Sequence, residues 1–215
     1  GGARLANGDR LFDPATVERK LEGEEIVLHE RGGWSWPELD LVSHAAGGSP
    51  RAHRDALTLL AVFMQHADTK PEQQRILCPD DACEHPLMML NDVGITFGRA
   101  NLSNHRAIGA VNLDEWKRQP VWKGPVGCVG NLSKSLTGTL KDPIISQEGR
   151  EFLAGLMAQL SHRQLHDLFT TARVELRPSG NVDGWIAAFR AKQREIEERR
   201  CVDAWWTTAP PAFTA

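Results

Sequence analysis

The strongest hydrophobic pattern in the chain lies between Arg51 and His66 and predicts a buried helix. Apolar residues recur there at helical spacing and cover most of the helix surface. They are Ala56, Leu57, Leu59, Leu60, Ala61, Val62, Phe63 and Met64. Proline lacks an amide hydrogen, so Pro71 ends any continuation of this helix.

Short apolar runs bounded by residues typical of turns predict a few strands. Arg75 to Leu77 and Leu87 to Leu90 are such runs, and one or two more strands are expected between Thr16 and Leu28. Residues 29–50 are rich in Gly, Pro and Ser, which predicts a loop. Trp34 and Trp36 would anchor this loop to the rest of the protein.

The C-terminal third is predicted to be helical. Ser146 is a candidate N-cap for a first helix, and Ser161 forms a capping-box pair with Gln164 at the start of a second. A third helix begins near Asn181 or Asp183 and ends in a charged stretch, residues 194–200, that we expect to face solvent. The apolar stripes of these helices, which include Phe152, Leu156 and Leu168, are expected in the core. Residues 99–142 are predicted as extended loops with one helical turn near Leu113 to Lys117.

These patterns predict a single α+β fold that is mainly helical and has a few short strands. The chain has 215 residues and a net charge of −3, which gives no reason to expect nucleic acid as a partner. It contains no run of about 18 apolar residues, so no membrane-spanning segment is expected. The compartment, cytoplasmic or secreted, stays open at this point.

The four cysteines leave several possibilities open. Cys78 and Cys83 flank a turn and could form a disulfide, or they could bind zinc together with His85. The favoured prediction is that all four, including Cys128 and Cys201, are free thiols, because four are too few for a disulfide scaffold.

Two acidic residues in neighbouring loops are the candidates for chemistry. Asp68 follows the buried helix, and Asp92 follows the apolar run that ends at Leu90. Phosphoryl transfer requires one carboxylate to orient the nucleophile, a second to hold Mg²⁺ against the phosphates, and a cation to offset developing charge. Asp68 could be the base, Asp92 the metal ligand and Lys70 the cation. Gly94 would let the backbone turn sharply beside the metal.

At these residues the sequence resembles the protein-kinase superfamily. The segment from His66 to Gln73 is similar to the catalytic loop His-Arg-Asp-Leu-Lys-Pro-Glu-Asn, with matches at His66, Asp68, Lys70, Pro71 and Glu72. The triplet Asp92-Val93-Gly94 resembles the Asp-Phe-Gly metal motif. The wider stretch from 91 to 98, together with the tryptophan-containing loops and residues 128–133, is similar to atypical members, including a group of bacterial kinase-like proteins. That similarity covers most of the chain.

The resemblance implies a fold like the C-terminal lobe of a kinase and a role for each matching residue. Asp68 and Lys70 would be catalytic, and Asp92 would bind Mg²⁺. Gln73 stands where the family has its second metal-binding Asn, so it would contact the metal and the nucleotide. Glu18 would lie near the adenine of ATP. Ala67 replaces the family's catalytic-loop arginine, so phosphate sensing through that arginine is not implied.

The resemblance also implies three parts of the chain and a missing partner lobe. Residues 1–50 would hold hinge-like strands and a connecting loop, residues 51–200 the large lobe, and residues 201–215 a tail. No strand Lys, helix Glu or Gly-rich phosphate cover precedes residue 50, so these would lie upstream of Gly1. The chain as given would then be inactive or very weak.

Three functions follow for the complete parent protein. The first is transfer of phosphate from ATP, with Mg²⁺, to an acceptor that the sequence does not identify. The second is a pseudokinase that binds a partner or a nucleotide without catalysis. The third is a metal-dependent hydrolase that uses Asp68, Asp92 and His66.

Overall fold

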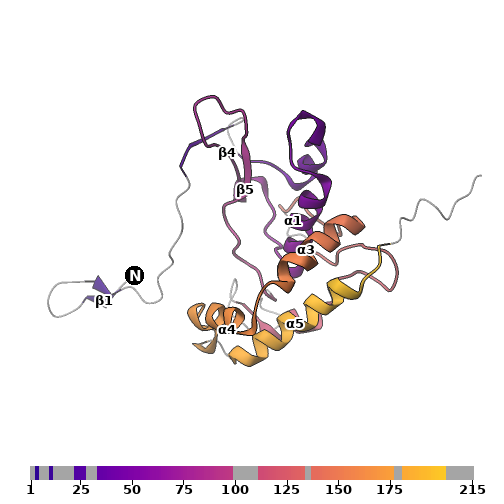
Figure 1. The fold of residues 1–215 in the computed structure, drawn as a ribbon. Helices are drawn as coiled ribbons and strands as arrows, with labels where there is room; N and C mark the ends of the chain where they lie inside the picture. The colour runs from indigo at the N-terminus through magenta and orange to yellow at the C-terminus, as the bar shows by residue number, and fades with distance from the viewer. Residues whose placement is uncertain are drawn as a thin grey trace, which may run out of the picture.

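The computed structural model describes residues 22–27, 33–98, 111–133, 137–176 and 181–201, and the backbone of two short paired strands near the N-terminus. The fold is α+β and mainly helical (Figure 1). The strands are β1 (Ala3–Arg4), β2 (Arg10–Leu11), β3 (Glu24–Glu25), β4 (Gln74–Cys78) and β5 (Leu87–Leu90). The α-helices are α1 (Arg51–Met64), α2 (Leu113–Arg118), α3 (Gln147–Ala158), α4 (His162–Thr171) and α5 (Val182–Glu198). The 3₁₀ helices within the described ranges are η1 (Trp36–Leu41), η2 (His44–Ala46), η3 (Pro71–Gln73) and η5 (Val174–Leu176). No helix among the described residues is long and apolar enough to cross a membrane.

Helix α1 lies at the centre of the molecule, as its all-round apolar pattern predicts. It packs against α3, which in turn contacts α5, and α4 lies beside α5 (Figure 1). An aromatic cluster fills the space between α1, α2 and α5, where Trp116 stacks on Trp185 with ring centroids 5.6 Å apart and meets Phe63 edge to face. The indole nitrogen of Trp116 donates to the Phe63 carbonyl at 2.8 Å, so this buried polar atom is paired.

The contact between α1 and α3 depends on a glycine. A Cβ atom at Gly149 would lie 2.3 Å from the Cβ of Asp55, so the two helices can approach this closely only because Gly149 has no side chain. Asp55 is buried here, and its carboxylate accepts from the backbone N–H of Ser146 at 2.9 Å. Ser146 in turn caps α3 by accepting from the Gly149 N–H, as predicted.

The three-stranded sheet is antiparallel, in the order β3-β4-β5. In the β4–β5 hairpin Gln74 pairs with Leu90 and Leu77 with Leu87. An antiparallel hairpin of this register brings the residue before β4 next to the residue after β5. The two loops that contain Asp68 and Asp92 therefore emerge side by side.

All four cysteines form disulfides, so the prediction of free thiols is wrong. Cys78 pairs with Cys83 across the turn of the β4–β5 hairpin, and Cys128 pairs with Cys201. The first bond was one of the open alternatives. The second joins residues 73 positions apart, and only the tertiary fold brings these two cysteines together.

Three other expectations from the pattern need correction. The predicted loop at 29–50 contains the 3₁₀ helices η1 and η2, while Trp34 and Trp36 anchor it by being buried in the core. The charged end of α5 is not wholly solvated, because Ile196 is fully buried. On α3 and α4, Phe152, Leu156 and Leu168 are exposed, because each helix turns only part of its apolar stripe toward its neighbours.

Candidate active site

The structure brings the Asp68 and Asp92 loops together through Gln73. The side-chain amide of Gln73 donates to Oδ2 of Asp68 at 3.1 Å. Its backbone carbonyl accepts from the N–H groups of Asn91 and Asp92, at 2.8 and 3.2 Å. One residue therefore links both candidate loops, and the hairpin register places it there.

Asp68 and Asp92 differ in their surroundings. Asp68 is largely buried, with 18% of its side chain exposed, and the Lys70 Nζ lies 3.7 Å from its Oδ2. Asp92 is exposed, and its Oδ1 accepts from the Gly94 N–H at 2.7 Å. The Asp68 carboxylate is thus held in place by a cation and an amide, whereas the Asp92 carboxylate faces solvent beside a tight turn.

His66 is fully buried, close enough to both acidic residues for their charges to act on its ring. Burial lowers the pKa of its imidazole, while the charge of Asp68, the backbone of Gly94 and the charge of Asp92 each oppose that effect. Neither ring nitrogen reaches a partner at full hydrogen-bond geometry, although the Gly94 backbone is close enough to influence the pKa. His66 packs edge to face against Trp36, and this contact helps to hold the loop that carries Asp68.

The loop that carries Asp68 is fixed by residues that the sequence did not single out. Thr69 is fully buried, and its carbonyl accepts from the Thr139 hydroxyl at 2.8 Å. Its own hydroxyl accepts from the N–H groups of Thr139 and Leu140, both at 3.1 Å. Because Thr69 and Thr139 are 70 positions apart, no local pattern could have indicated this contact.

A second set of contacts holds the same loop from the side of Trp36. In the orientation that pairs both atoms of its amide, the buried Gln74 donates to the Lys70 carbonyl at 2.6 Å and accepts from Trp36 Nε1 at 2.9 Å. Gly33, at a φ of +75°, allows close approach here, since a Cβ there would lie 2.0 Å from the Pro71 carbonyl oxygen. These contacts fix the backbone of the loop before any ligand binds.

The segment after Asp92 has an unusual backbone. Ile95 and Phe97 adopt positive φ values of 52° and 56°, which side chains with a Cβ rarely take and β-branched ones least of all. The Phe97 N–H donates to the Met64 carbonyl at 2.6 Å, so the end of α1 holds this segment. Local strain of this kind is concentrated at functional sites in proteins.

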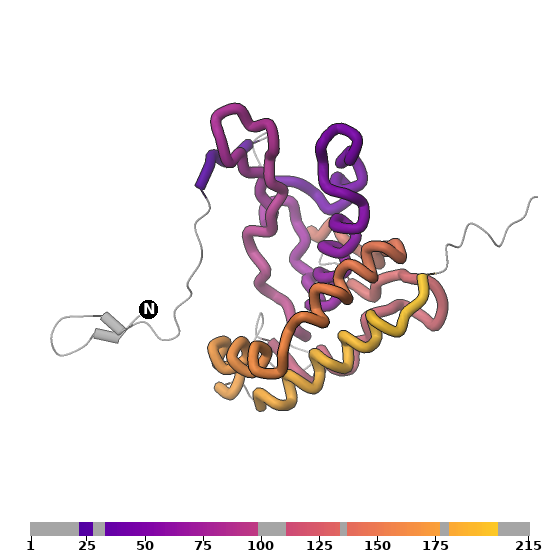
Figure 2. The backbone as a smooth tube through the Cα atoms, in the orientation of Figure 1, coloured from indigo at the N-terminus to yellow at the C-terminus, as the bar shows by residue number. Residues whose placement is uncertain are grey.

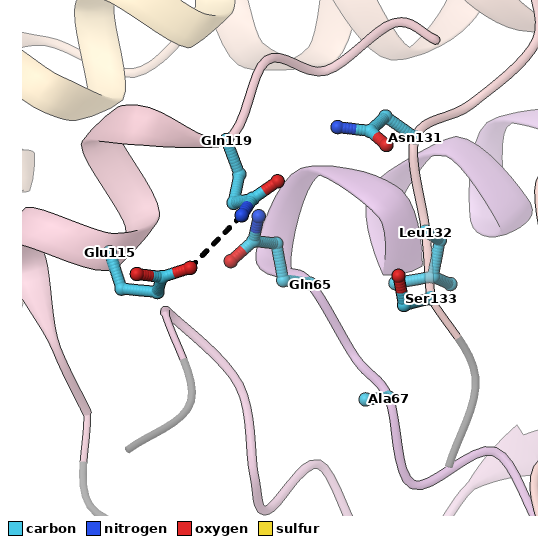
Figure 3. Close-up of a pocket in the computed structure, with 7 residues that line it drawn as sticks. All are labelled: Gln65, Ala67, Glu115, Gln119, Asn131, Leu132 and Ser133. Atoms are coloured by element: carbon cyan, nitrogen blue, oxygen red, sulfur yellow. Dashed lines mark hydrogen bonds between the residues drawn. The ribbon is translucent and has the colours of Figure 1, made fainter. Parts of the chain in front are cut away.

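A small polar cavity of about 200 Å³ lies beside Ala67, the neighbour of Asp68 in the chain. Figure 3 shows Gln65, at the end of α1, opposite the hydrogen-bonded pair of Glu115 and Gln119, with Asn131 and Ser133 on the remaining wall. The small Ala67 side chain leaves this space open. Amide, hydroxyl and carboxylate groups line it, so it suits a polar ligand better than an apolar one.

The side chains at the site fit a magnesium ion that is shared with phosphate oxygens. Mg²⁺ prefers oxygen ligands and usually takes only one or two from the protein. Asp92 offers a solvent-facing carboxylate, and Gln73 offers its amide oxygen, since its nitrogen is the atom that donates to Asp68. Within the described part of the chain, no group of three or more His, Cys, Asp or Glu side chains is placed to hold a metal ion without such help.

One predicted site residue, Glu18, lies outside the described residues, as do residues 99–110 and 134–136 of the predicted loop region 99–142. The other four predicted site residues lie together at the open end of the β4–β5 hairpin. Asp68, Lys70 and Gln73 precede β4, and Asp92 follows β5. Comparisons of this chain with protein-family models, with curated proteins and with solved structures found no match.

Proposed function

We propose that this chain forms the acceptor-binding and metal-binding half of a kinase-like phosphotransferase that uses ATP and Mg²⁺. The observation that supports the proposal best is the link through Gln73, which ties the Asp68 carboxylate to the backbone of Asp92. Two carboxylates in adjacent, rigid loops, one beside a cation and one facing solvent, match what phosphoryl transfer requires of a protein.

Each residue has a distinct role in this proposal. Asp68 accepts the hydrogen bond of the acceptor hydroxyl, orients its oxygen and takes its proton as the new bond forms. Lys70 and the Gln73 amide keep the Asp68 carboxylate fixed while it does so, and Lys70 offsets negative charge on the transferred phosphate. Asp92 and Gln73 would hold Mg²⁺, which supplies charge neutralisation for the phosphates when bound. Glu18 would contribute near the adenine.

Phosphate transfer from radiolabelled ATP by the protein made from its complete gene tests this function. We expect Asp68→Ala to lower kcat by about 10²–10⁴-fold, the usual contribution of a general base, with the fold unchanged by circular dichroism. Asp81→Asn, an exposed acid in the hairpin turn, is the matched control and should leave kcat unchanged. Equal rates for Asp68→Ala and the parent protein would rule out the proposed base.

A non-catalytic binding module is the second candidate, and one observation favours it. Among the described residues no three His, Cys, Asp or Glu side chains come together to hold a metal ion, so Asp92 and the Gln73 amide oxygen would have to hold it with one carboxylate. Such a site would bind the metal weakly and could bind nucleotide without transferring phosphate. Saturable ATP binding without phosphate transfer in the complete protein would establish this alternative.

The two disulfides support a proposal about compartment. Structural disulfides form and persist in oxidising environments such as the periplasm or the extracellular space. Because all four cysteines are paired, we propose that the protein folds in such a compartment. Thiol labelling of the protein isolated from its native cells tests this, since free thiols in the unfolded, unreduced chain would contradict it.

A further inference from the structure

A second cavity lies away from the candidate active site, between α1, the η1–η2 segment and the turn end of the β4–β5 hairpin. Its volume is about 630 Å³, within the range of about 300–1,000 Å³ that is usual for sites of small organic ligands. Figure 2 shows the hairpin and the η1–η2 segment side by side at the same end of the molecule.

The wall of this cavity is mainly apolar. Leu39, Leu57 and Met88 line it together with Leu41 and Leu87. Leu41 and Leu87 are 79% and 47% exposed, although burying a leucine side chain away from water stabilises a folded protein. An apolar ligand would remove both from solvent.

The charged group that could recognise a ligand in this cavity is the guanidinium of Arg54. Arg54 lines the cavity, and its Nη1 donates to the Leu39 carbonyl. Its Nε is buried and has no hydrogen-bond partner. Within the described residues, no carboxylate lies within ion-pair distance of this guanidinium. The nearest acid in sequence, Asp55, accepts instead from Ser146 and pairs with Arg51.

The other charged groups of the lining do not neutralise Arg54. Glu84 is exposed and forms no ion pair with it in the described structure, and His53 and His85 add positive charge when protonated. His53 stacks on Phe152, with ring centroids 4.3 Å apart, at the α3 side of the cavity. The Arg54 guanidinium is partly buried, has no counter-ion among the described residues and lies in an apolar wall. Such a site favours a ligand that combines an anionic group with an apolar chain.

We propose that this cavity binds an aliphatic carboxylate, with the carboxylate on Arg54 and the chain along the leucine and methionine wall. A carboxylate matches the fork of the guanidinium in shape, and its single charge balances the single cation. This site is independent of the proposed phosphoryl transfer, so either proposal can fail without the other.

Isothermal titration of the chain with decanoate, below its micelle concentration at pH 7.5, tests the proposal. We expect one saturable site, and binding of 1-decanol that is weaker by about tenfold or more, because the alcohol lacks the charge. Arg54→Gln should weaken decanoate binding by a similar factor and leave decanol binding unchanged. Arg54→Lys, which keeps the charge, should retain most of the affinity.

Two controls separate this site from general attraction of fatty acids to a surface. Arg51→Gln removes a more exposed cation one turn away, outside the cavity, and should not change the affinity. Leu41→Ser should weaken decanoate and decanol alike, since it removes part of the apolar wall. Non-saturable uptake, equal affinity for acid and alcohol, or equal losses in Arg51→Gln and Arg54→Gln would each overturn the proposal.

Discussion

At the scale of single residues, the buried imidazole of His66 should make the stability of the protein depend on pH. His66 is fully buried, and burial lowers the pKa of its imidazole. His66 therefore binds a proton more readily in the unfolded chain, where its pKa is about 6.5, than in the folded one. The contribution of neutral His66 to stability is complete above that pH and is lost as pH falls toward the lower, folded-state pKa.

We predict that His66→Gln makes the free energy of unfolding less sensitive to pH between about 7 and 5. Urea denaturation at a series of pH values measures this sensitivity, and the slope matters even if the variant is less stable throughout. His162→Gln, the same substitution at an exposed histidine of α4, is the matched control. A slope that is as steep in His66→Gln as in the parent chain would show that His66 does not titrate as described.

The candidate acids could be singled out from the sequence because Asp68 follows a strongly periodic helix, Asp92 follows a short apolar run, and each belongs to a short motif. The residues that fix them could not. Thr69, Thr139 and Gln74 are ordinary polar residues in sequence, and their importance comes from hydrogen bonds that connect distant segments. Buried polar groups of this kind are determined by the tertiary fold.

At the scale of elements, helices with strong periodicity and clear caps matched the sequence best. Ser146 and Ser161 cap α3 and α4 as predicted, and β5 spans the predicted residues, Leu87–Leu90. The short 3₁₀ helices η1 and η2 were missed, because their Gly-, Pro- and Ser-rich segment has no sustained period.

The contact between α1 and α3 gives a prediction for one glycine. Gly149→Ala should lower the free energy of unfolding by about 1–3 kcal/mol, because the new Cβ would meet the Cβ of Asp55. Gly155→Ala, on the same helix, has open space around it and should raise stability by about 0.5–1 kcal/mol through helix propensity. Chemical denaturation of both variants measures the two effects. Stabilisation by both substitutions would contradict the close packing of the helices.

At the scale of the whole molecule, the Cys128–Cys201 bond joins the end of α5 to the loop after α2. Contacts beside it hold the same two regions together: Glu195 accepts from the Val121 N–H at 2.8 Å, and Arg199 donates to the Gly127 carbonyl at 2.6 Å. Sequence reasoning could not identify this pairing, since cysteine connectivity depends on which segments the fold brings together.

We predict that the long disulfide contributes more to stability than the short one. Closing a loop of 73 residues stabilises a protein by about 4 kcal/mol in the chain-entropy model, whereas the separation of 5 between Cys78 and Cys83 gives about 2 kcal/mol. Urea unfolding of the double serine variants C128S/C201S and C78S/C83S compares the two bonds. A larger loss of stability in C78S/C83S than in C128S/C201S would contradict this prediction.

The central claim concerns the whole site: Asp68 and Asp92 belong to one metal–nucleotide centre. Paramagnetic NMR with Mn²⁺ in place of Mg²⁺ tests it directly. Together with ATP, Mn²⁺ should broaden the amide signals of residues 68–73 and 91–94 ahead of all others, and Asp92→Asn should abolish this broadening while Asp81→Asn does not. Broadening that spares these residues, or that persists in Asp92→Asn, would contradict the account.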